Sequence, residues 1–91
     1  MFYTYILKCN DNTLYTGYTN NITDRILTHN SGKGAKYTRG RTPVQLVYLE
    51  EYKDKITAQR REREIKKLTR KAKLKLIQNK EVIIWVLSFK K

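Results

Sequence analysis

Four polar side chains in the first third of the chain have types and spacings that suit work on a phosphodiester. Tyr5 and Tyr15 are ten residues apart on two segments joined by a short turn, so an antiparallel hairpin can bring them to one face. Arg25 and His29 are four residues apart, which places them on one face of a helix. Arginine offers phosphate oxygens a planar fork that keeps its charge. Tyrosine and histidine can donate to, or accept from, an attacking water.

Each of these residues also has an ordinary structural explanation. Tyrosines in strands are commonly half-buried core residues with a hydrated hydroxyl. A single arginine on a helix is commonly a solvated charge, and a single histidine beside apolar residues is commonly a well-partnered helix residue. Only the combination of spacings favours a shared site.

A fifth residue, Glu62, falls within the apolar stripe of a predicted helix. It follows Ala58 by four residues and precedes Ile65 by three. A carboxylate that faces a core needs a partner, because an unpaired buried charge is costly. That partner is either Lys66, one helical turn later, or a divalent cation. Mg²⁺ is often held by one or two carboxylates together with water and substrate oxygens, and the sequence leaves both possibilities open.

A hairpin and two helices are needed to position these residues. Two segments rich in β-branched and aromatic residues flank a turn at Asn10-Asp11-Asn12 and predict the hairpin. Asn21 is a suitable N-cap for the helix that carries Arg25. The predicted strands cover residues 2–9, 13–18 and 44–52, and the predicted helices cover residues 22–30, a stretch that begins at Asp54 or Thr57, and residues 70–79. We therefore expect an α+β fold, with a small three-stranded, mostly antiparallel sheet flanked by helices in the order β-β-α-β-α-α.

The composition indicates one small domain with a polyanionic partner. The 91 residues include 20 Lys and Arg against 8 Asp and Glu, a formal net charge of +12. Such a charge attracts nucleic acid, although an anionic membrane or a ribosomal surface would attract it too. One cysteine, Cys9, forms no internal disulfide, and the longest apolar run, Val82 to Leu87, is too short to cross a bilayer. We expect a cytoplasmic protein with no membrane and no small-molecule cofactor among its partners.

The motifs, taken in order, resemble those of the GIY-YIG nuclease superfamily. Tyr3-Thr4-Tyr5 resembles the first triplet, and Tyr15-Thr16-Gly17 resembles the second. Both triplets depart from Gly-Ile-Tyr and Tyr-Ile-Gly, yet they keep the two tyrosines and the final glycine. The spacing to Arg25 and His29 agrees with the family, and Ala58-x-x-x-Glu62-x-x-Ile65 resembles its metal-binding helix.

The resemblance covers residues 2–77, and residues 32–43 resemble a loop of the small single-domain bacterial subgroup of uncharacterised GIY-YIG proteins. We therefore expect a GIY-YIG-like nuclease domain at residues 1–79. Residues 80–91 would form an apolar and basic tail that either packs against this domain or is free. No separate DNA-binding domain accompanies the motifs, so a protein partner would supply target choice.

The resemblance implies a metal-dependent endonuclease that hydrolyses phosphodiester bonds in nucleic acid, expected to be DNA, in repair or processing. Glu62 would be the protein ligand of one Mg²⁺ or Mn²⁺, and Arg25 would neutralise charge on the phosphoryl oxygens. Tyr15 or Tyr5 would orient or deprotonate the attacking water. A tyrosine with a pKa near 10 is a poor base at neutral pH, so the choice between them stays open. His29 would support that step or hold the phosphate.

A glycine-rich loop and a basic helical region are the expected contacts with the nucleic-acid backbone. Residues 31–43 hold three of the four glycines and the one proline. The expected binding residues in this loop are Lys33, Lys36, Arg39 and Arg41, with Tyr37 available to stack on a base. The alternative is a solvated, mobile connection. Residues 60–80 carry ten basic and two acidic residues, which form either a solvated face or a surface with non-specific affinity for phosphates.

A different class of function fits the same charge. The chain could be a basic nucleic-acid-binding module without turnover, or an adaptor subunit for a nuclease. The loose triplets and the missing targeting domain favour this alternative. The presence of all five polar residues at the family spacing favours the enzyme.

Overall fold

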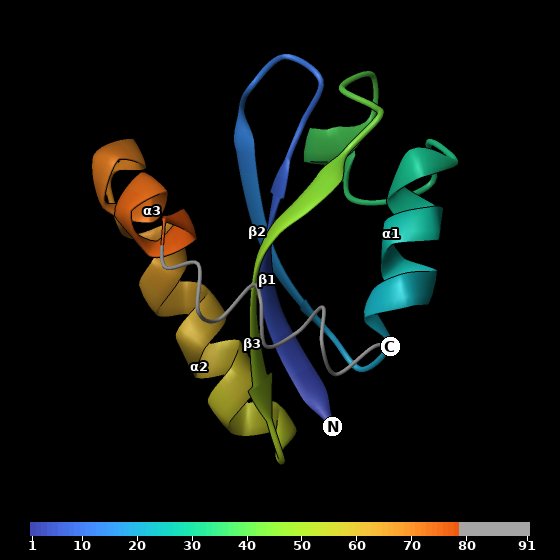
Figure 1. The fold of residues 1–91 in the computed structure, drawn as a ribbon. Coiled ribbons are helices and arrows are strands. Elements are labelled where there is room, and N and C mark those ends of the chain that lie inside the picture. The colour runs from blue at the N-terminus through green and yellow to red at the C-terminus, as the bar shows by residue number, and fades with distance from the viewer. Residues whose placement is uncertain (79–91) are drawn as a thin grey trace.

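The computed structural model describes residues 1–78, in which a sheet of three strands is flanked by three α-helices (Figure 1). The predicted order of elements is confirmed. The elements are β1 (Phe2–Lys8), β2 (Leu14–Thr19), α1 (Ile22–Asn30), a short 3₁₀ helix η1 (Lys36–Thr38), β3 (Gln45–Tyr52), α2 (Lys55–Lys66) and α3 (Arg70–Ile77).

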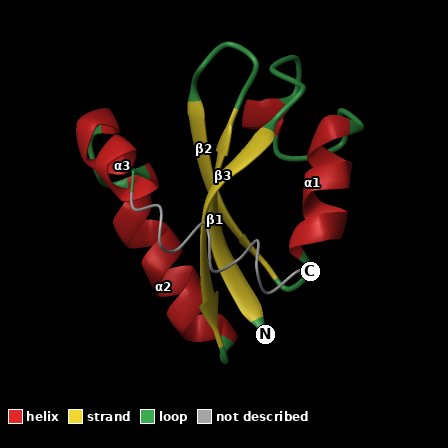
Figure 2. Cartoon of the chain, in the orientation of Figure 1, coloured by secondary structure: helices red, strands yellow, loops and turns green. Residues whose placement is uncertain are grey.

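The strands form one antiparallel sheet in the order β2-β1-β3 (Figure 2). In the central strand, Tyr5 lies opposite Gly17 of β2 on one side and Leu49 of β3 on the other. Helix α1 covers one face of this sheet, whereas α2 and α3 cover the other (Figure 1). This arrangement confirms the expected α+β class with a small antiparallel sheet flanked by helices.

Alternate residues of β1 face two separate apolar cores. Tyr5 and Leu7 pack with Ile22 of α1, and Ile6 packs with Ile65 of α2. All four of the aliphatic residues named here are buried. Because successive side chains of a strand point to opposite faces, the sheet separates the residues of α1 from those of α2.

The hairpin turn falls at the predicted Asn10-Asp11-Asn12. Asn12 has a φ of 67°, a left-handed conformation that asparagine adopts more readily than most residues. Asp11 accepts hydrogen bonds from both the backbone N–H and the hydroxyl of Thr13. The turn therefore has the residues it needs to join β1 to β2.

Side-chain caps define where α1 and α2, the first two of the predicted helices, begin. The side chain of Asn21 accepts a hydrogen bond from the Asp24 N–H, as expected of an N-cap. Of the two residues proposed to begin the second helix, Asp54 is the cap, and it accepts from the Thr57 N–H at 2.8 Å. These caps fix the first turn of each helix and hence the positions of the functional side chains that follow.

Helix α2 is fastened to the sheet by polar contacts as well as by its apolar stripe. Arg61 Nε donates to Glu50 at 2.9 Å, and the hydroxyls of Tyr48 and Tyr52 donate to the same carboxylate. Burial would raise the pKa of Glu50, but these donors outweigh it and lower the pKa. The carboxylate therefore stays charged and holds α2 beside β3.

The predicted tail at residues 80–91, with its apolar run from Val82 to Leu87, lies outside the described residues. No helix among residues 1–78 is both long and apolar enough to cross a membrane.

Candidate active site

The hydroxyl of Tyr5 is the meeting point of the polar side chains on the α1 face. Its oxygen lies 3.1 Å from His29 Nε2 and accepts a hydrogen bond from Arg25 Nε at 3.4 Å. Arg25 and His29 lie one turn apart on α1, as the sequence spacing predicted. The structure therefore brings Tyr5 of the first triplet together with the two candidate site residues of α1.

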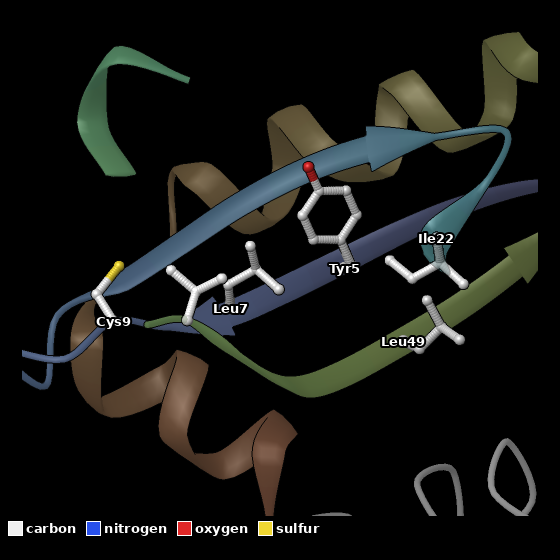
Figure 3. Packing of buried hydrophobic residues seen from close by; sticks show 6 residues of the cluster. Tyr5, Leu7, Cys9, Ile22 and Leu49 are labelled. Carbon is white, nitrogen blue, oxygen red and sulfur yellow. The ribbon is translucent and has the colours of Figure 1, made fainter. Parts of the chain in front are cut away.

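Gly17 makes this arrangement possible. It lies opposite Tyr5 in the sheet, and a Cβ atom at this position would be 2.5 Å from the Tyr5 hydroxyl oxygen and 2.7 Å from Cζ. Figure 3 shows the Tyr5 ring beside Leu7 on the same side of β1, with its hydroxyl directed toward β2. The glycine of the second triplet is thus needed because the phenol lies directly over its backbone.

Tyr15 is the more accessible of the two motif tyrosines. It is partly buried, whereas Tyr5 is only 1% exposed. The Tyr15 ring lies 5.3 Å from the His29 ring and 6.4 Å from the Tyr5 ring, centroid to centroid. Hydrogen bonding to Tyr5 raises the pKa of Arg25, and Tyr15 contributes to the same effect. Both tyrosines therefore lie close to one guanidinium.

His29 is completely buried and fully partnered. Its Nδ1 lies 2.8 Å from Thr38 Oγ1 of the short helix η1. Gly34 approaches the ring so closely that an added Cβ would be 2.5 Å from Nδ1. Burial, assisted by the charge of Arg25, lowers the pKa of His29 to about 4. The imidazole is therefore neutral at physiological pH.

Burial raises the pKa of Tyr5, because it disfavours the charged phenolate. The pKa of this phenol is about 12, despite the hydrogen bond from Arg25 that lowers it. Of the two tyrosines proposed to activate water, Tyr5 is thus fully protonated at neutral pH and is shielded from solvent. Tyr15 is the one that solvent reaches.

Glu62 belongs to the other layer of the molecule. It lies on α2, across the sheet from α1, and its side chain is 16% exposed. Its Oε2 lies 3.4 Å from Lys66 Nζ, so the ordinary partner proposed from the sequence is present. Its charge also contributes to the raised pKa of Tyr5, which places the carboxylate within electrostatic range of the tyrosine.

Glu62 could contribute one carboxylate to a divalent cation. Among residues 1–78 there is no group of three or more His, Cys, Asp or Glu side chains that could hold a metal ion. A single half-buried carboxylate nevertheless fits Mg²⁺ chemistry, because this ion commonly keeps several waters and takes the remaining oxygens from a substrate phosphate. The residues present are therefore compatible with a cation that is completed by substrate.

A surface hollow beside Arg25 brings in a second cation that the sequence analysis missed. The hollow is lined by Arg25, Lys55, Phe2, Tyr18, Thr19 and Asn20. Arg25 comes from α1 and Lys55 from the first residue of α2, so the two helices contribute charge to one place. The hollow therefore has one cationic side chain from each helix layer in its lining.

The predicted binding loop has more internal structure than a mobile connection. Thr38 is buried within it, and Tyr37 stacks on Tyr15 with ring centroids 5.9 Å apart. Arg41 lies 4.4 Å from the Tyr37 ring and forms an ion pair with Asp11 at 2.7 Å. Tyr37 and Arg41 thus have partners within the protein, and their expected role in binding nucleic acid stays a prediction.

The other three basic residues proposed for this loop are exposed. The exposed residues are Lys33, Lys36 and Arg39. They lie in or next to the loop segment that ends in η1, whose Thr38 contacts His29. Arg39 Nε also donates to the Gly34 carbonyl at 3.4 Å. Their charges are therefore open to solvent, and they lie in the loop that also contacts the α1-face cluster of Tyr5, Tyr15, Arg25 and His29 through Thr38 and Tyr37.

Sequence reasoning missed Thr38, Gly34 and Lys55 for identifiable reasons. Thr38 and Gly34 lie in a loop without any period that would assign their direction. The one available signal was that Gly34 follows His29 by five residues, and a glycine near a histidine in the sequence only weakly indicates that its backbone packs against the imidazole ring. Lys55 is 30 residues from Arg25, and only the pairing of the two layers brings them to one hollow.

Comparison with known proteins gives consistent matches over most of the chain. The model of the GIY-YIG catalytic domain matches residues 1–75. A UPF0213 protein from Clostridium perfringens is 61% identical over 82 residues, which cover 90% of this chain and 88% of that protein. Another UPF0213 protein, from Staphylococcus haemolyticus, is 59% identical over 78 residues, with 86% of this chain and 95% of that protein covered.

Solved structures show the same relationship. The solution structure of a UPF0213 protein from Bacillus halodurans matches with a TM-score of 0.55 at 50% sequence identity, covering 85% of this chain and 83% of that one. A solution structure of a protein from E. faecalis matches with a TM-score of 0.50 at 35% identity, covering 96% and 85%.

Proposed function

The chain belongs to the GIY-YIG family, within the group of proteins called UPF0213, and on that premise we propose that it is a metal-dependent endonuclease acting on DNA. The observation that supports this proposal most is the convergence of Arg25 and His29 on the Tyr5 hydroxyl, beside the partly exposed Tyr15. The reaction is hydrolysis of a phosphodiester in repair or processing. Water adds to phosphorus, one P–O ester bond breaks, and the departing oxygen gains a proton.

Arg25 and Lys55 are the residues proposed to hold the scissile phosphate. Both line the same hollow, and the guanidinium keeps its charge because hydrogen bonding to Tyr5 raises its pKa. Two fixed cations would stabilise the negative charge that develops on the phosphoryl oxygens in the transition state. The bond from Arg25 Nε to Tyr5 limits the directions in which the guanidinium can point.

Tyr15 is the tyrosine proposed to orient the attacking water. It is partly exposed and close to Arg25, whereas Tyr5 is buried and has a pKa of about 12. A hydroxyl can direct a water by hydrogen bonding without losing its own proton. In this proposal Tyr5 and His29 do not contact the substrate. They hold Arg25 through the Tyr5 hydroxyl and pack against the Tyr15 ring.

Glu62 is the proposed protein ligand for Mg²⁺ or Mn²⁺. Nucleases of the GIY-YIG family generally use divalent metals, and when such an ion is bound it supplies Lewis-acid stabilisation of the phosphate and the leaving oxygen. Lys66 Nζ lies 3.4 Å from one oxygen of this carboxylate, so the lysine limits the directions in which the side chain can point in the free protein.

The positive charge of the whole chain supports a nucleic-acid substrate. A formal charge of +12 raises the local concentration of a polyanion. The exposed Lys33, Lys36 and Arg39 are the residues proposed to follow its backbone, while Tyr37 and Arg41 shape the loop that presents them. These contacts carry no base readout, so we propose that a protein partner supplies target choice.

The test is a cleavage assay on labelled single-stranded, duplex, nicked and branched DNA, with RNA alongside, in Mg²⁺ and in Mn²⁺. We expect metal-dependent products from DNA with the wild-type protein. Arg25→Gln should lower the single-turnover rate by about a hundredfold or more, and Arg60→Gln, a change of an exposed arginine, should not. Preferential cleavage of RNA would contradict the choice of DNA. Absence of products from every substrate would overturn the proposed nuclease activity, and equal rates for wild type and Arg25→Gln would overturn the role of Arg25 in it.

One observation favours the second candidate function, a binding module without turnover. Glu62 already has a cationic partner in Lys66, which could hold the carboxylate in a purely structural role. In that case wild-type protein and Glu62→Gln would bind the same substrates equally and cleave none of them.

A further inference from the structure

The buried contacts around His29 form one continuous chain, and their donors and acceptors can be assigned. We propose that Thr38 is a positioning residue of the active site, because its hydroxyl oxygen accepts a hydrogen bond from the Nδ1–H of His29. This bond fixes the tautomer of His29 in which Nε2 is unprotonated and accepts a hydrogen bond from the Tyr5 hydroxyl. The tautomer can be tested without any activity. Its consequence for catalysis rests on the proposed nuclease function.

Thr38 is completely buried, so the direction of its hydroxyl proton is set by its protein neighbours. Its hydroxyl oxygen lies 2.9 Å from the Ala35 carbonyl oxygen and 2.8 Å from His29 Nδ1. A carbonyl can only accept, and two oxygens this close need a proton between them, so the single hydroxyl proton of Thr38 points to Ala35. Thr38 must then accept from His29, which places the imidazole proton on Nδ1.

The other side of the ring gives the same answer independently. Arg25 Nε donates to the Tyr5 oxygen. If Nε2 of His29 also carried a proton, Tyr5 would accept twice, and its own proton would need another acceptor. Tyr5 is 1% exposed, and within residues 1–78 its hydroxyl has hydrogen bonds only to Arg25 and His29. Every buried donor is therefore satisfied only when Nε2 accepts from Tyr5.

The result is a directed run of hydrogen bonds from Arg25 through Tyr5 and His29 to Thr38. Gly34 is needed for this run of hydrogen bonds. A Cβ atom at this position would be 2.5 Å from His29 Nδ1 and would push the imidazole ring away from Thr38. Because the Tyr5 hydroxyl donates its hydrogen bond to His29, its oxygen accepts the hydrogen bond from Arg25 Nε and so orients the guanidinium. Thr38 thus acts on the phosphate-binding arginine through two intervening side chains.

The tautomer can be read directly by ¹⁵N NMR of the imidazole ring, because the chain contains a single histidine. At pH 7 we expect Nδ1 protonated and Nε2 unprotonated in the wild-type protein and in Thr38→Ser, which keeps the hydroxyl. Thr38→Val keeps the shape but removes the acceptor, so its ring should shift toward the Nε2–H tautomer. A wild-type ring with Nε2–H, or a doubly protonated ring at pH 7, would overturn the proposal even if Thr38→Val did not fold.

Single-turnover cleavage then tests the role in catalysis. Thr38→Val should lower the rate at saturating protein by about tenfold to a hundredfold, since small displacements of a positioned group have effects of this size. Thr38→Ser should restore most of the rate, which a defect in packing alone would not predict. Equal rates in wild type and Thr38→Val would refute the positioning role while leaving the nuclease intact. No cleavage by wild type would refute the nuclease while the tautomer stands.

Discussion

Tyr5 lies at the centre of the candidate site, and its surroundings decide what it can do. Its ring packs in the core of the α1 face, and its hydroxyl contacts Arg25 and His29. Spacing alone could predict that Arg25 and His29 share one face of α1, because helical geometry places residues i and i+4 one turn apart. Spacing could not predict Thr38, whose loop has no period. It also left open which tyrosine faces water, because that depends on burial.

Neutral His29 should make the stability of the fold sensitive to mild acid. In the unfolded chain a histidine titrates near 6.5, whereas in the fold its pKa is about 4. Between these values the unfolded chain binds a proton that the folded protein does not, so stability is full above pH 6.5 and falls as the pH decreases. From pH 7.5 to 5.5 the free energy of unfolding should drop by about 1 kcal/mol.

Urea unfolding at the two pH values measures this drop. At pH 5.5 most unperturbed carboxylates are still ionised, so the histidine dominates the difference. His29→Gln, which cannot titrate, is the control and should show little pH dependence over the same range. A wild-type protein that is equally stable at both values, or that is more stable at pH 5.5, would show that His29 is not held neutral.

At the scale of elements, the layers are fixed by contacts that the sequence pattern only partly reveals. The β-branched and aromatic residues of the first segment predicted a strand, yet β3 contains a bulge where Ile6 pairs with Tyr48 and Leu7 pairs with Leu46. Val47 is the extra residue, which lets it and Tyr48 pack on the same side. No simple alternation predicts such a shift, because it depends on the partner strand.

The two threonines of the motif triplets provide a test at this scale. Both are buried on the α2 face, but only Thr4 has a partner: its hydroxyl donates to the Ala58 carbonyl at 2.8 Å. Within residues 1–78, Thr16 Oγ1 has no hydrogen-bond partner. Thr4→Val should therefore lower the free energy of unfolding by about 1 kcal/mol. Thr16→Val should leave it unchanged or raise it, because it removes an unsatisfied hydroxyl.

The two substitutions serve as each other's control, since both exchange a hydroxyl for a methyl group at a buried strand position. Denaturant unfolding of the two variants beside wild type gives the comparison. If Thr16→Val proved as destabilising as Thr4→Val, the hydrogen bond to α2 would not be the cause of the difference.

At the scale of the whole molecule, the sheet divides the five motif residues between two layers. Sequence reasoning predicted the order of elements, because that order follows from local patterns of residue types. It did not predict that Glu62 lies across the sheet from Arg25, or that Lys55 joins Arg25 at one hollow. Both facts depend on how helices are distributed over the two faces, which a single sequence does not specify.

The uneven placement of charge predicts how binding responds to salt. Lys33 and Lys36 are exposed beside the α1-face cluster, and each phosphate they neutralise releases counterions. In EDTA, the double variant Lys33→Ala with Lys36→Ala should bind duplex DNA with a salt slope reduced by about 2. Arg41→Ala should reduce it less, because Arg41 is paired with Asp11. An unchanged slope in the double variant would remove these lysines from the interface.

The most direct test of the account is the metal-dependent cleavage rate of Glu62→Gln beside Glu64→Gln. Both glutamates lie on α2 and both pair with a cation of the same helix, Lys66 for Glu62 and Arg61 for Glu64. The single-turnover rate on the preferred DNA should fall by at least about a hundredfold in Glu62→Gln and stay near wild type in Glu64→Gln, with affinity in EDTA unchanged in both. Equal cleavage by Glu62→Gln and wild type would contradict the account.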